Sequence, residues 1–393
     1  MTAPSAGEAA PFTYGRELGA RELVDREAEL AELRAVLRGH GRHFLVGPRR
    51  FGKSSLLRAA AEGGERGGAL VLRYDLQRFA GFDRLVRQLV ADVARRTAGP
   101  ADRALAAVKA AFRSLRPELT WDPAQGGVGV TLGVRAAADD LPLVCDALDG
   151  LDRHAERQGI PVAVVLDEVQ RLVERGGTDA EGQLRAATQA HRHVAYVFAG
   201  SATRLLAAMT TEPDRPFYRL GSRRFLGPIP RDAFRKFLAK GLATVSRPAP
   251  DGIEAILDLA EDVPYDVQRL AHACWSDARA RRGRPRMDAE AVRRVHGEIA
   301  RTNEPLYMHL WSSLTAAQQR ALLLLLDPAA VEEGLLSAGT ARRARLPVST
   351  LQRAFDALVD RQVLREELAV GGRTLKFEDP LFKGWVGLTI PGL

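Results

Sequence analysis

Two glycines, a lysine and a serine in one short segment form the strongest chemical pattern in the sequence. Four residues separate Gly47 from Gly52, and Lys53 and Ser54 follow directly, with an apolar stretch before the segment and helix-forming residues after it. A strand, a glycine-rich loop and a helix in this order are typical of a site for the phosphates of ATP. The residues predicted to form it are Gly47, Pro48, Arg49, Arg50, Phe51, Gly52, Lys53, Ser54 and Ser55.

Each residue type in this loop has a chemical role. Glycines let backbone N–H groups curl round the β-phosphate, and the helix N-terminus adds partial positive charge. Lys53 can bridge the β and γ oxygens, and the Ser54 hydroxyl can bind Mg²⁺, which prefers oxygen ligands. A glycine-rich turn that matches by accident is the alternative, and the flanking strand and helix argue against it. The loop therefore predicts ATP and Mg²⁺ as cofactors.

A pair of carboxylates, Asp167 and Glu168, follows the apolar residues 162–166. A strand that delivers a carboxylate at its C-terminal end is the usual second half of an ATP site, so Asp167 is predicted to hold the metal. Glu168, directly after it, is placed to orient an attacking water and take its proton. The sequence therefore predicts hydrolysis of ATP as well as binding.

Two further residues are candidates for the same chemistry. Ser201 closes a third apolar strand and could reach the γ-phosphate or the water, although a plain turn at a strand end is the alternative. Arg219 lies in a basic segment and could neutralise charge on the phosphate in the transition state, in cis or from a neighbouring subunit. A solvated basic loop is the other interpretation of Arg219.

The composition excludes several classes of protein. A chain of 393 residues is too long for one ordinary domain, so we expect two or three. It has no run of eighteen uncharged apolar residues and no signal-peptide pattern, so we expect no membrane association. Cys145 and Cys274 lie far apart without ligand spacing, which argues against a disulfide framework or zinc site and favours a cytoplasmic location.

The net charge of +8 raises the question of nucleic-acid binding. Only six of the 57 basic residues are lysine, an arginine bias that often reflects a G+C-rich coding sequence. The excess is concentrated in residues 201–250, which carry ten basic and three acidic side chains. The charge by itself therefore does not identify a nucleic-acid surface.

Strands alternate with helices through the first part of the chain, which predicts an α/β fold with a parallel sheet covered on both faces. Residues 126–132 alternate with period two and predict a hairpin before the next helix. From residue 231 to about 330 the pattern is helical. The last stretch has helices followed by a hairpin over residues 363–377, turning at Gly371-Gly372, which is the order of a winged helix.

Several segments together resemble the archaeal-type ATPase family, within the STAND branch of P-loop NTPases related to AAA+ proteins. The resemblance covers nearly the whole chain. The segments that carry it are residues 23–30, 165–170, Gly200-Ser201 with Met209, and residues 216–219, 226–229, 263–270 and 377–385.

The resemblance implies an ATPase core, a helical lid and a C-terminal winged helix. It also implies that Val24–Arg26 and Pro264 line the adenine pocket and that Gln268 or Arg269 senses phosphate from the lid. Asp262 stands where such proteins usually have glycine. The expected domains are an N-terminal mobile arm at 1–20, a P-loop ATPase core at 21–230, a helical lid at 231–313 and a winged-helix domain at 314–393.

Three functions fit these observations. The first is an ATP-driven switch or oligomerising motor that acts on a protein partner or assembles with itself. The second is a DNA-associated ATPase that docks on duplex through its winged helix, and the third is a scaffold that binds ATP and barely hydrolyses it. Residues 314–393 carry ten basic and nine acidic side chains, so we expect this domain to contact the ATPase body or a protein partner rather than DNA.

Overall fold

The computed structural model describes residues 10–97, 101–122, 127–133, 141–201, 203–369 and 372–391. The described residues form two compact units. The first, here called the sheet unit, comprises residues 17–48 and 52–227. The second, the helical unit, comprises residues 10–16, 49–51 and 228–391. None of the helices in the described part of the chain has the length and hydropathy to cross a bilayer.

A five-stranded sheet forms the centre of the sheet unit, with all neighbouring strands parallel. Its strand order is β2-β5-β6-β1-β7, so β6 separates β1 from β5. Residues of β5 and β6 are buried throughout, and all except Asp167 at the end of β5 are uncharged, as expected of strands covered on both faces. The strands are β1 (Arg42–Val46), β2 (Leu70–Asp75), β5 (Val162–Asp167), β6 (Val194–Gly200) and β7 (Ser222–Phe225).

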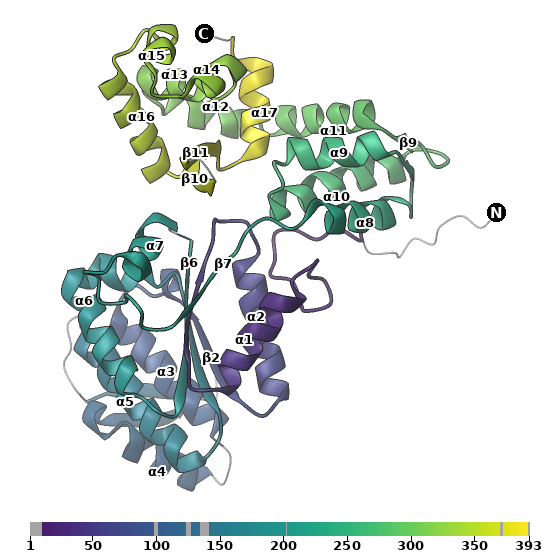
Figure 1. Cartoon of the computed structure of the whole chain (residues 1–393). Helices are drawn as coiled ribbons and strands as arrows, with labels where there is room; N and C mark the ends of the chain where they lie inside the picture. The colour runs from purple at the N-terminus through teal and green to yellow at the C-terminus, as the bar shows by residue number, and fades with distance from the viewer. Residues whose placement is uncertain are drawn as a thin grey trace. The chain divides into compact units, whose positions relative to one another are not determined.

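Helices cover both faces of this sheet, with α1 and α2 on one side and α3 to α6 on the other (Figure 1). The α/β class with a parallel sheet, predicted from the sequence, is confirmed. A two-stranded antiparallel sheet precedes α5, where a hairpin was predicted; Gly126 lies outside the described residues. The remaining elements are α1 (Glu27–Arg38), α2 (Lys53–Arg66), α3 (Phe82–Arg96), α4 (Ala101–Ala111), β3 (Pro117–Asp122), β4 (Gly127–Leu132), α5 (Leu141–Gln158), α6 (Gln170–Ala190) and α7 (Thr203–Thr211).

The helical unit contains the segments predicted as lid and winged helix. The order of helices followed by a hairpin, expected for residues 314–393, is present: β10 pairs with β11, and Ala369 lies opposite Gly372. The turn residue Gly371 is outside the described residues, and the predicted boundary at residue 314 falls inside this unit. The elements are α8 (Arg231–Leu242), β8 (Arg247–Pro248), α9 (Pro250–Leu259), α10 (Pro264–Ala280), β9 (Arg286–Met287), α11 (Ala289–Thr302), α12 (Glu304–Ser312), α13 (Ala316–Leu324), α14 (Pro328–Glu333), α15 (Ala338–Ala344), α16 (Val348–Asp360), β10 (Leu364–Ala369), β11 (Gly372–Phe377) and α17 (Pro380–Thr389).

The N-terminal segment differs from the mobile arm expected over residues 1–20. Phe12 is only 1% exposed, and its ring meets that of Phe237 edge-on at 5.5 Å. The backbone N–H of Thr13 donates to the Gln268 side chain at 2.9 Å. Residues 10–16 are therefore packed in the helical unit through Phe12 and through Tyr14, whose ring meets those of Tyr265 and His272 edge-on. Residues 1–9 lie outside the described part.

Replacing Phe12 by alanine should destabilise the helical unit by about 3 kcal/mol, because a buried aromatic side chain leaves a cavity. Chemical denaturation followed by tryptophan fluorescence measures this, since Trp275, Trp311 and Trp385 all lie in that unit. Phe225→Ala is the control, because Phe225 is 52% exposed. Equal effects of the two substitutions would show that the N-terminal segment does not contribute to the folded unit.

Candidate functional site

The phosphate loop leaves the sheet where β1 ends at Val46. A Cβ on Gly47 would lie 2.9 Å from the Leu226 Cβ and 3.0 Å from its carbonyl oxygen, so only glycine fits beneath the residue that follows β7. Gly52 has φ +88°, the left-handed conformation that glycine adopts without strain, and directly precedes α2. The two glycines thus allow the sharp passage from strand to helix that the sequence predicted.

Lys53, the first residue of α2, folds back over the loop. Its side chain is buried, and Nζ donates hydrogen bonds to the carbonyls of Gly47 at 2.7 Å and Pro48 at 2.8 Å. The ammonium group is therefore held at the loop, beside the N-terminus of a helix. This is a position from which it can neutralise phosphate oxygens.

Ser54 and Asp167, the two predicted metal ligands, are in contact. The Ser54 hydroxyl donates to Asp167 Oδ2 at 3.1 Å. Burial raises the pKa of Asp167, and the neighbouring Glu168 carboxylate adds to this, while Lys53 and the Ser54 hydrogen bond act in the opposite direction. A buried carboxylate beside a hydroxyl is a donor set of hard oxygens, which fits Mg²⁺ with water completing its shell.

Glu168 and Ser201 come together because β5 and β6 are neighbours. Leu166 pairs with Phe198, and Val46 pairs with Gly200, so the segments after β5, β6 and β1 leave the same edge of the sheet. The Ser201 hydroxyl donates to Glu168 Oε2 at 2.7 Å. A plain strand-end turn would not require this contact, so the geometry supports including Ser201 in the site.

Gln170 contacts Glu168 and is a candidate site residue that the sequence did not predict. Its side chain is buried, and its Nε2 donates to the same Oε2 of Glu168 that accepts from Ser201. Glu168 itself has φ +58°, a left-handed conformation that is strained for a non-glycine residue. The only signal in the sequence was the place of Gln170 in the segment 165–170 that carries the family resemblance.

Of the residues 24–26 predicted to line the adenine pocket, Arg26 is hydrogen-bonded to the backbone of a distant segment. Its guanidinium is buried, donates to the Gly227 carbonyl at 2.6 Å and pairs with Glu29 at 2.9 Å. It therefore links the segment before α1 to the segment after β7, while Val24 is half-buried nearby in sequence. Their role toward adenine stays a prediction.

Arg219 is exposed and stacks its guanidinium over the Tyr218 ring at 5.1 Å. The other arginine of this loop, Arg215, pairs with the buried Glu181 at 2.7 Å. Arg215 therefore has a structural partner, and Arg219 is the arginine of the pair that faces solvent. Its role as an arginine finger stays a prediction.

The predicted lid residues lie in the helical unit at the start of α10. Pro264 is its first residue, Gln268 binds the Thr13 backbone, and Arg269 is 4.0 Å from Asp379. Asp262 has φ +57°, so it keeps the conformation that glycine favours at this position, and its carboxylate pairs with Arg231 at 2.9 Å. The departure from the family pattern is thus accommodated by an aspartate in a glycine-like conformation.

Arg50, predicted as a phosphate-loop residue, is bound to carboxylates within the helical unit. Its guanidinium lies 3.6 Å from Asp266 and 3.7 Å from Asp379, and it donates to the Glu378 carbonyl at 3.3 Å. Its own carbonyl accepts from the Tyr265 N–H at 3.2 Å. These partners are far from Arg50 in sequence, and the sequence reasoning missed them.

Asp266 is fully buried, and neither of its carboxylate oxygens accepts a hydrogen bond from the described residues. Burial raises the pKa of Asp266 to about 7, although the Arg50 guanidinium acts to lower it. The charged form is therefore poorly compensated inside the unit.

Comparison with known proteins gives similarity of structure rather than of sequence. No model of a known protein family matches the chain. None of the curated proteins matches it either.

Two solved structures share its fold over nearly the whole length. A Walker-type ATPase of Pyrococcus abyssi is 18% identical with a TM-score of 0.54, covering 96% of this chain and 99% of that one. The ORC2 protein of Aeropyrum pernix, solved in ADPNP–ADP complexes, is 12% identical with a TM-score of 0.53 and the same coverage. The chain therefore shares its fold over nearly its whole length with these two proteins, one of which is a Walker-type ATPase.

The buried Asp266 makes stability depend on pH. The carboxyl has an ordinary pKa of 3.8 and one of about 7 in the folded chain, so its favourable contribution is fully present below about pH 4 and is lost as the pH rises through 7. Asp266→Asn should remove this loss, of which about 3 kcal/mol falls between pH 5 and pH 8. The difference in free energy of unfolding, variant minus wild type, should thus increase between pH 5 and pH 8. Denaturant titrations at both pH values measure this difference, and Asp232→Asn is the control because Asp232 is exposed. A difference that does not change with pH would contradict the raised pKa of Asp266.

Proposed function

We propose that the chain binds ATP with Mg²⁺ and hydrolyses it. The observation that carries this proposal is the pair of contacts at one edge of the sheet, Ser54 with Asp167 and Ser201 with Glu168. They bring a metal-binding set and a general base to the strand ends next to the loop that holds Lys53. If the glycine-rich turn matched the loop pattern only by chance, neither of these two contacts would be expected.

The residues of the loop bind and orient the nucleotide. Backbone N–H groups of the non-proline loop residues at the N-terminus of α2 would surround the β-phosphate, and Lys53 would exchange its carbonyl partners for β and γ oxygens. Ser54 and Asp167 would hold Mg²⁺, which supplies positive charge to the phosphate oxygens. These contacts would hold the γ-phosphate close to Glu168 in an orientation suited to hydrolysis.

Glu168 takes the proton of the attacking water. Ser201 and Gln170 both donate to Oε2, so two neighbours fix the orientation of the carboxylate through one oxygen. Oε1 can then accept the water proton while Oε2 remains bound. Ser201 and Gln170 are positioning residues in this account, because they act on water through Glu168.

For the biological role we propose a nucleotide-dependent switch or oligomerising motor that acts on a protein partner. The C-terminal part of the helical unit supports a protein rather than DNA as partner. Arg343 pairs with Asp327 at 3.2 Å, and Arg353 donates to the backbone of its own helix. Arg343 is thus paired within this part of the unit, and residues 314–393 carry ten basic and nine acidic side chains, so their charges nearly cancel.

Glu168→Gln should retain ATP binding and lose hydrolysis by about 100-fold or more, because the amide cannot take a proton. Phosphate release measures turnover, and calorimetric titration with ATP measures binding. Glu174→Gln, an exposed carboxylate on α6, is the matched control and should leave both unchanged. Equal turnover in wild type and Glu168→Gln would remove Glu168 from the mechanism.

If Arg219 acts on the site of a neighbouring subunit, mixing Arg219→Ala with Glu168→Gln should restore turnover. Each variant alone should be impaired, whereas a mixed assembly contains interfaces in which an intact Glu168 faces an intact Arg219. Turnover measured across mixing ratios tests this. In the control mixture, Arg78→Ala takes the place of Arg219→Ala, because Arg78 is an exposed arginine elsewhere on the sheet unit. Absence of rescue at every ratio, with normal assembly, would assign Arg219 a role in cis or in structure only.

A further inference from the structure

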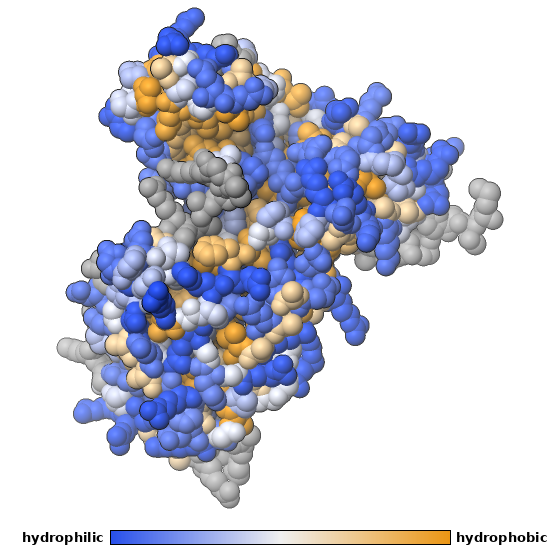
Figure 2. Space-filling view, viewed as in Figure 1, coloured by the Kyte–Doolittle hydropathy of each residue, from blue (hydrophilic) through white to orange (hydrophobic). Residues whose placement is uncertain are grey.

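Four arginines lie within six residues directly after α10. This stretch, residues 281–286, joins α10 to β9 and is here called the arginine loop. It projects beyond the ends of α9 and α11 (Figure 1), and Figure 2 shows mostly hydrophilic surface at this end of the helical unit. The four arginines, all of which are exposed, are Arg281, Arg282, Arg284 and Arg286.

The carboxylates beside the arginine loop are shared with other groups. Arg281 pairs with Asp277 at 3.1 Å, but Asp277 also pairs with Arg294 at 2.7 Å. Arg286 pairs with Asp288 at 3.3 Å, and the same Asp288 carboxylate caps the N-terminus of α11. These carboxylates therefore compensate the positive charge of the loop only in part.

The neighbouring strand β8 adds a further arginine. Arg247 lies opposite Arg286 in the parallel pairing of β8 with β9, and like charges at such positions repel each other. Arg247 is exposed and donates to the Arg284 carbonyl at 3.1 Å, and Arg284 donates to the Ser246 carbonyl at 3.1 Å. A further carboxylate near Arg286, Asp251, accepts from the backbone at the start of α11 at 3.1 Å. An anion bound at this surface would relieve the repulsion between the guanidinium groups.

The segment in which the sequence concentrates its positive charge, residues 201–250, differs from the arginine loop. Arg224 pairs with Glu32 at 2.5 Å, and Arg231 pairs with Asp262 at 2.9 Å. Carboxylates that are distant in sequence thus balance part of its charge. The arginine loop is therefore a stronger candidate for an anion-binding surface than the count along the sequence indicates.

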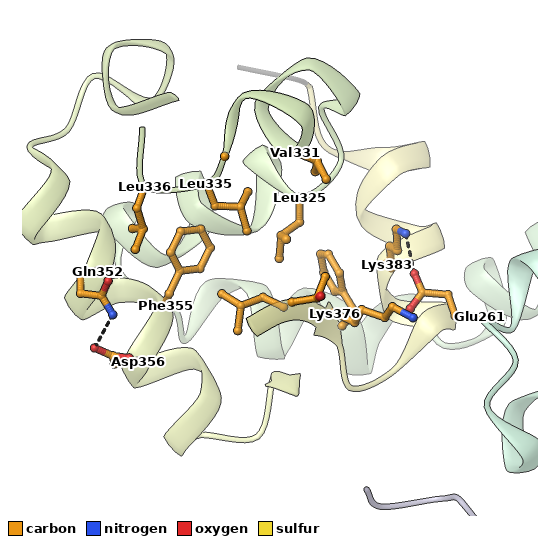
Figure 3. Close-up of a pocket in the computed structure, with 14 residues that line it drawn as sticks. Glu261, Leu325, Val331, Leu335, Leu336, Gln352, Phe355, Asp356, Lys376 and Lys383 are labelled. Atoms are coloured by element: carbon orange, nitrogen blue, oxygen red, sulfur yellow. Dashed lines mark hydrogen bonds and ion pairs between the residues drawn. The ribbon is translucent and has the colours of Figure 1, made fainter. Parts of the chain in front are cut away.

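The C-terminal helices carry a different kind of surface. Gln352 of α16 lines an apolar groove of about 530 Å³ and donates to Asp356 at 3.0 Å (Figure 3). At the other end of this groove, Lys383 pairs with Glu261 at 2.5 Å (Figure 3). An anionic partner is therefore expected at the arginine loop rather than at these helices.

The shape of the arginine loop favours a partner that itself has a groove. Because the loop projects from the unit, it can enter a groove of duplex DNA. Residues 281–286 contain no Asn, Gln, Ser or Thr for hydrogen bonds to base edges. Arginines inserted into a narrow minor groove respond instead to its strong negative potential, which is greatest in A·T tracts. Duplex RNA has a wide, shallow minor groove and lacks this feature.

The backbone at the tip of the loop is open for close approach. Gly283 lies between Arg282 and Arg284 and has φ +79°, a conformation that glycine adopts without strain. A Cβ on Gly283 would meet no atom of the described residues within 4 Å. Two arginines can therefore reach into a narrow groove without a bulky side chain between them.

We propose that the arginine loop binds the minor groove of A·T-rich duplex DNA. Arg282 and Arg284 enter the groove on either side of Gly283, and the flanking arginines contact phosphates. This site goes beyond the proposed action on a protein partner. It uses neither the ATP-binding residues nor the C-terminal helices.

Fluorescence anisotropy of a labelled A·T-rich duplex, titrated with the full chain, tests the proposal. At about 100 mM salt the wild type should bind more tightly than about 10 µM, and several-fold more tightly than it binds a G·C-rich duplex of the same length. Netropsin, which occupies the minor groove of A·T-rich DNA, should displace the chain. The double variant Arg282→Ala, Arg284→Ala should bind about tenfold or more weakly, because it removes both inserted side chains.

The matched control is the double variant Arg301→Ala, Arg342→Ala. Both arginines are exposed in the helical unit outside the arginine loop, so the control removes the same charge and should retain the affinity for the duplex. ATP binding measured on the same samples shows that the variants are folded. The duplex titration contains no nucleotide, so absence of ATP binding in the wild type would contradict the proposed function alone.

Four results would overturn the proposal. The first is binding of the A·T-rich duplex by the wild type that is weaker than about 10 µM. The second is an equal loss of affinity in the two double variants, which would show that binding follows net charge. The third is equal affinity for the A·T-rich and G·C-rich duplexes. The fourth is tighter binding of an acidic peptide than of the duplex, which would assign the loop to a protein partner.

Discussion

The order of three parallel strands, β5-β6-β1, is the constraint on which the candidate site depends. Parallel strands end at the same edge of a sheet, so the residues after each strand meet there without further adjustment. With β6 in the middle, Ser201 stands between the carboxylates after β5 and the phosphate loop after β1. A different order would separate Glu168 from Ser201, however well each segment matched its pattern. Burial of β5 and β6 on both faces holds this order in place, because the only charged side chain of the two strands is Asp167 at the end of β5.

Close packing beneath the loop adds a second constraint. Gly47 lies against Leu226, the residue after β7. The path of the loop therefore depends on β7, the edge strand next to β1. The sheet thus positions Lys53 from one side and Glu168 from the other. The strained backbone of Glu168 shows that its carboxylate is placed by surrounding structure rather than by local preference.

Features encoded in contiguous residues were predictable from the sequence. The loop from Gly47 to Ser54, the strand ending in Asp167 and the alternation of strands and helices each depend on local spacing, and the structure places them as expected. The missed features join residues far apart in sequence. Examples are Phe12 packed on Phe237, Arg50 bound near Asp266, and Gln352 turned toward Asp356 in a groove. No periodicity reports such contacts, because they depend on how separate elements pack.

The central claim is that the loop around Lys53 binds the phosphates of ATP. Calorimetric titration of the purified chain with ATP in the presence of Mg²⁺, compared with Lys53→Ala, tests it most directly. The account predicts saturable binding with one ATP per chain in the wild type and no measurable binding in the variant, because Lys53 is the ammonium group held at the loop. Equal affinity of a folded Lys53→Ala variant for ATP would contradict the account.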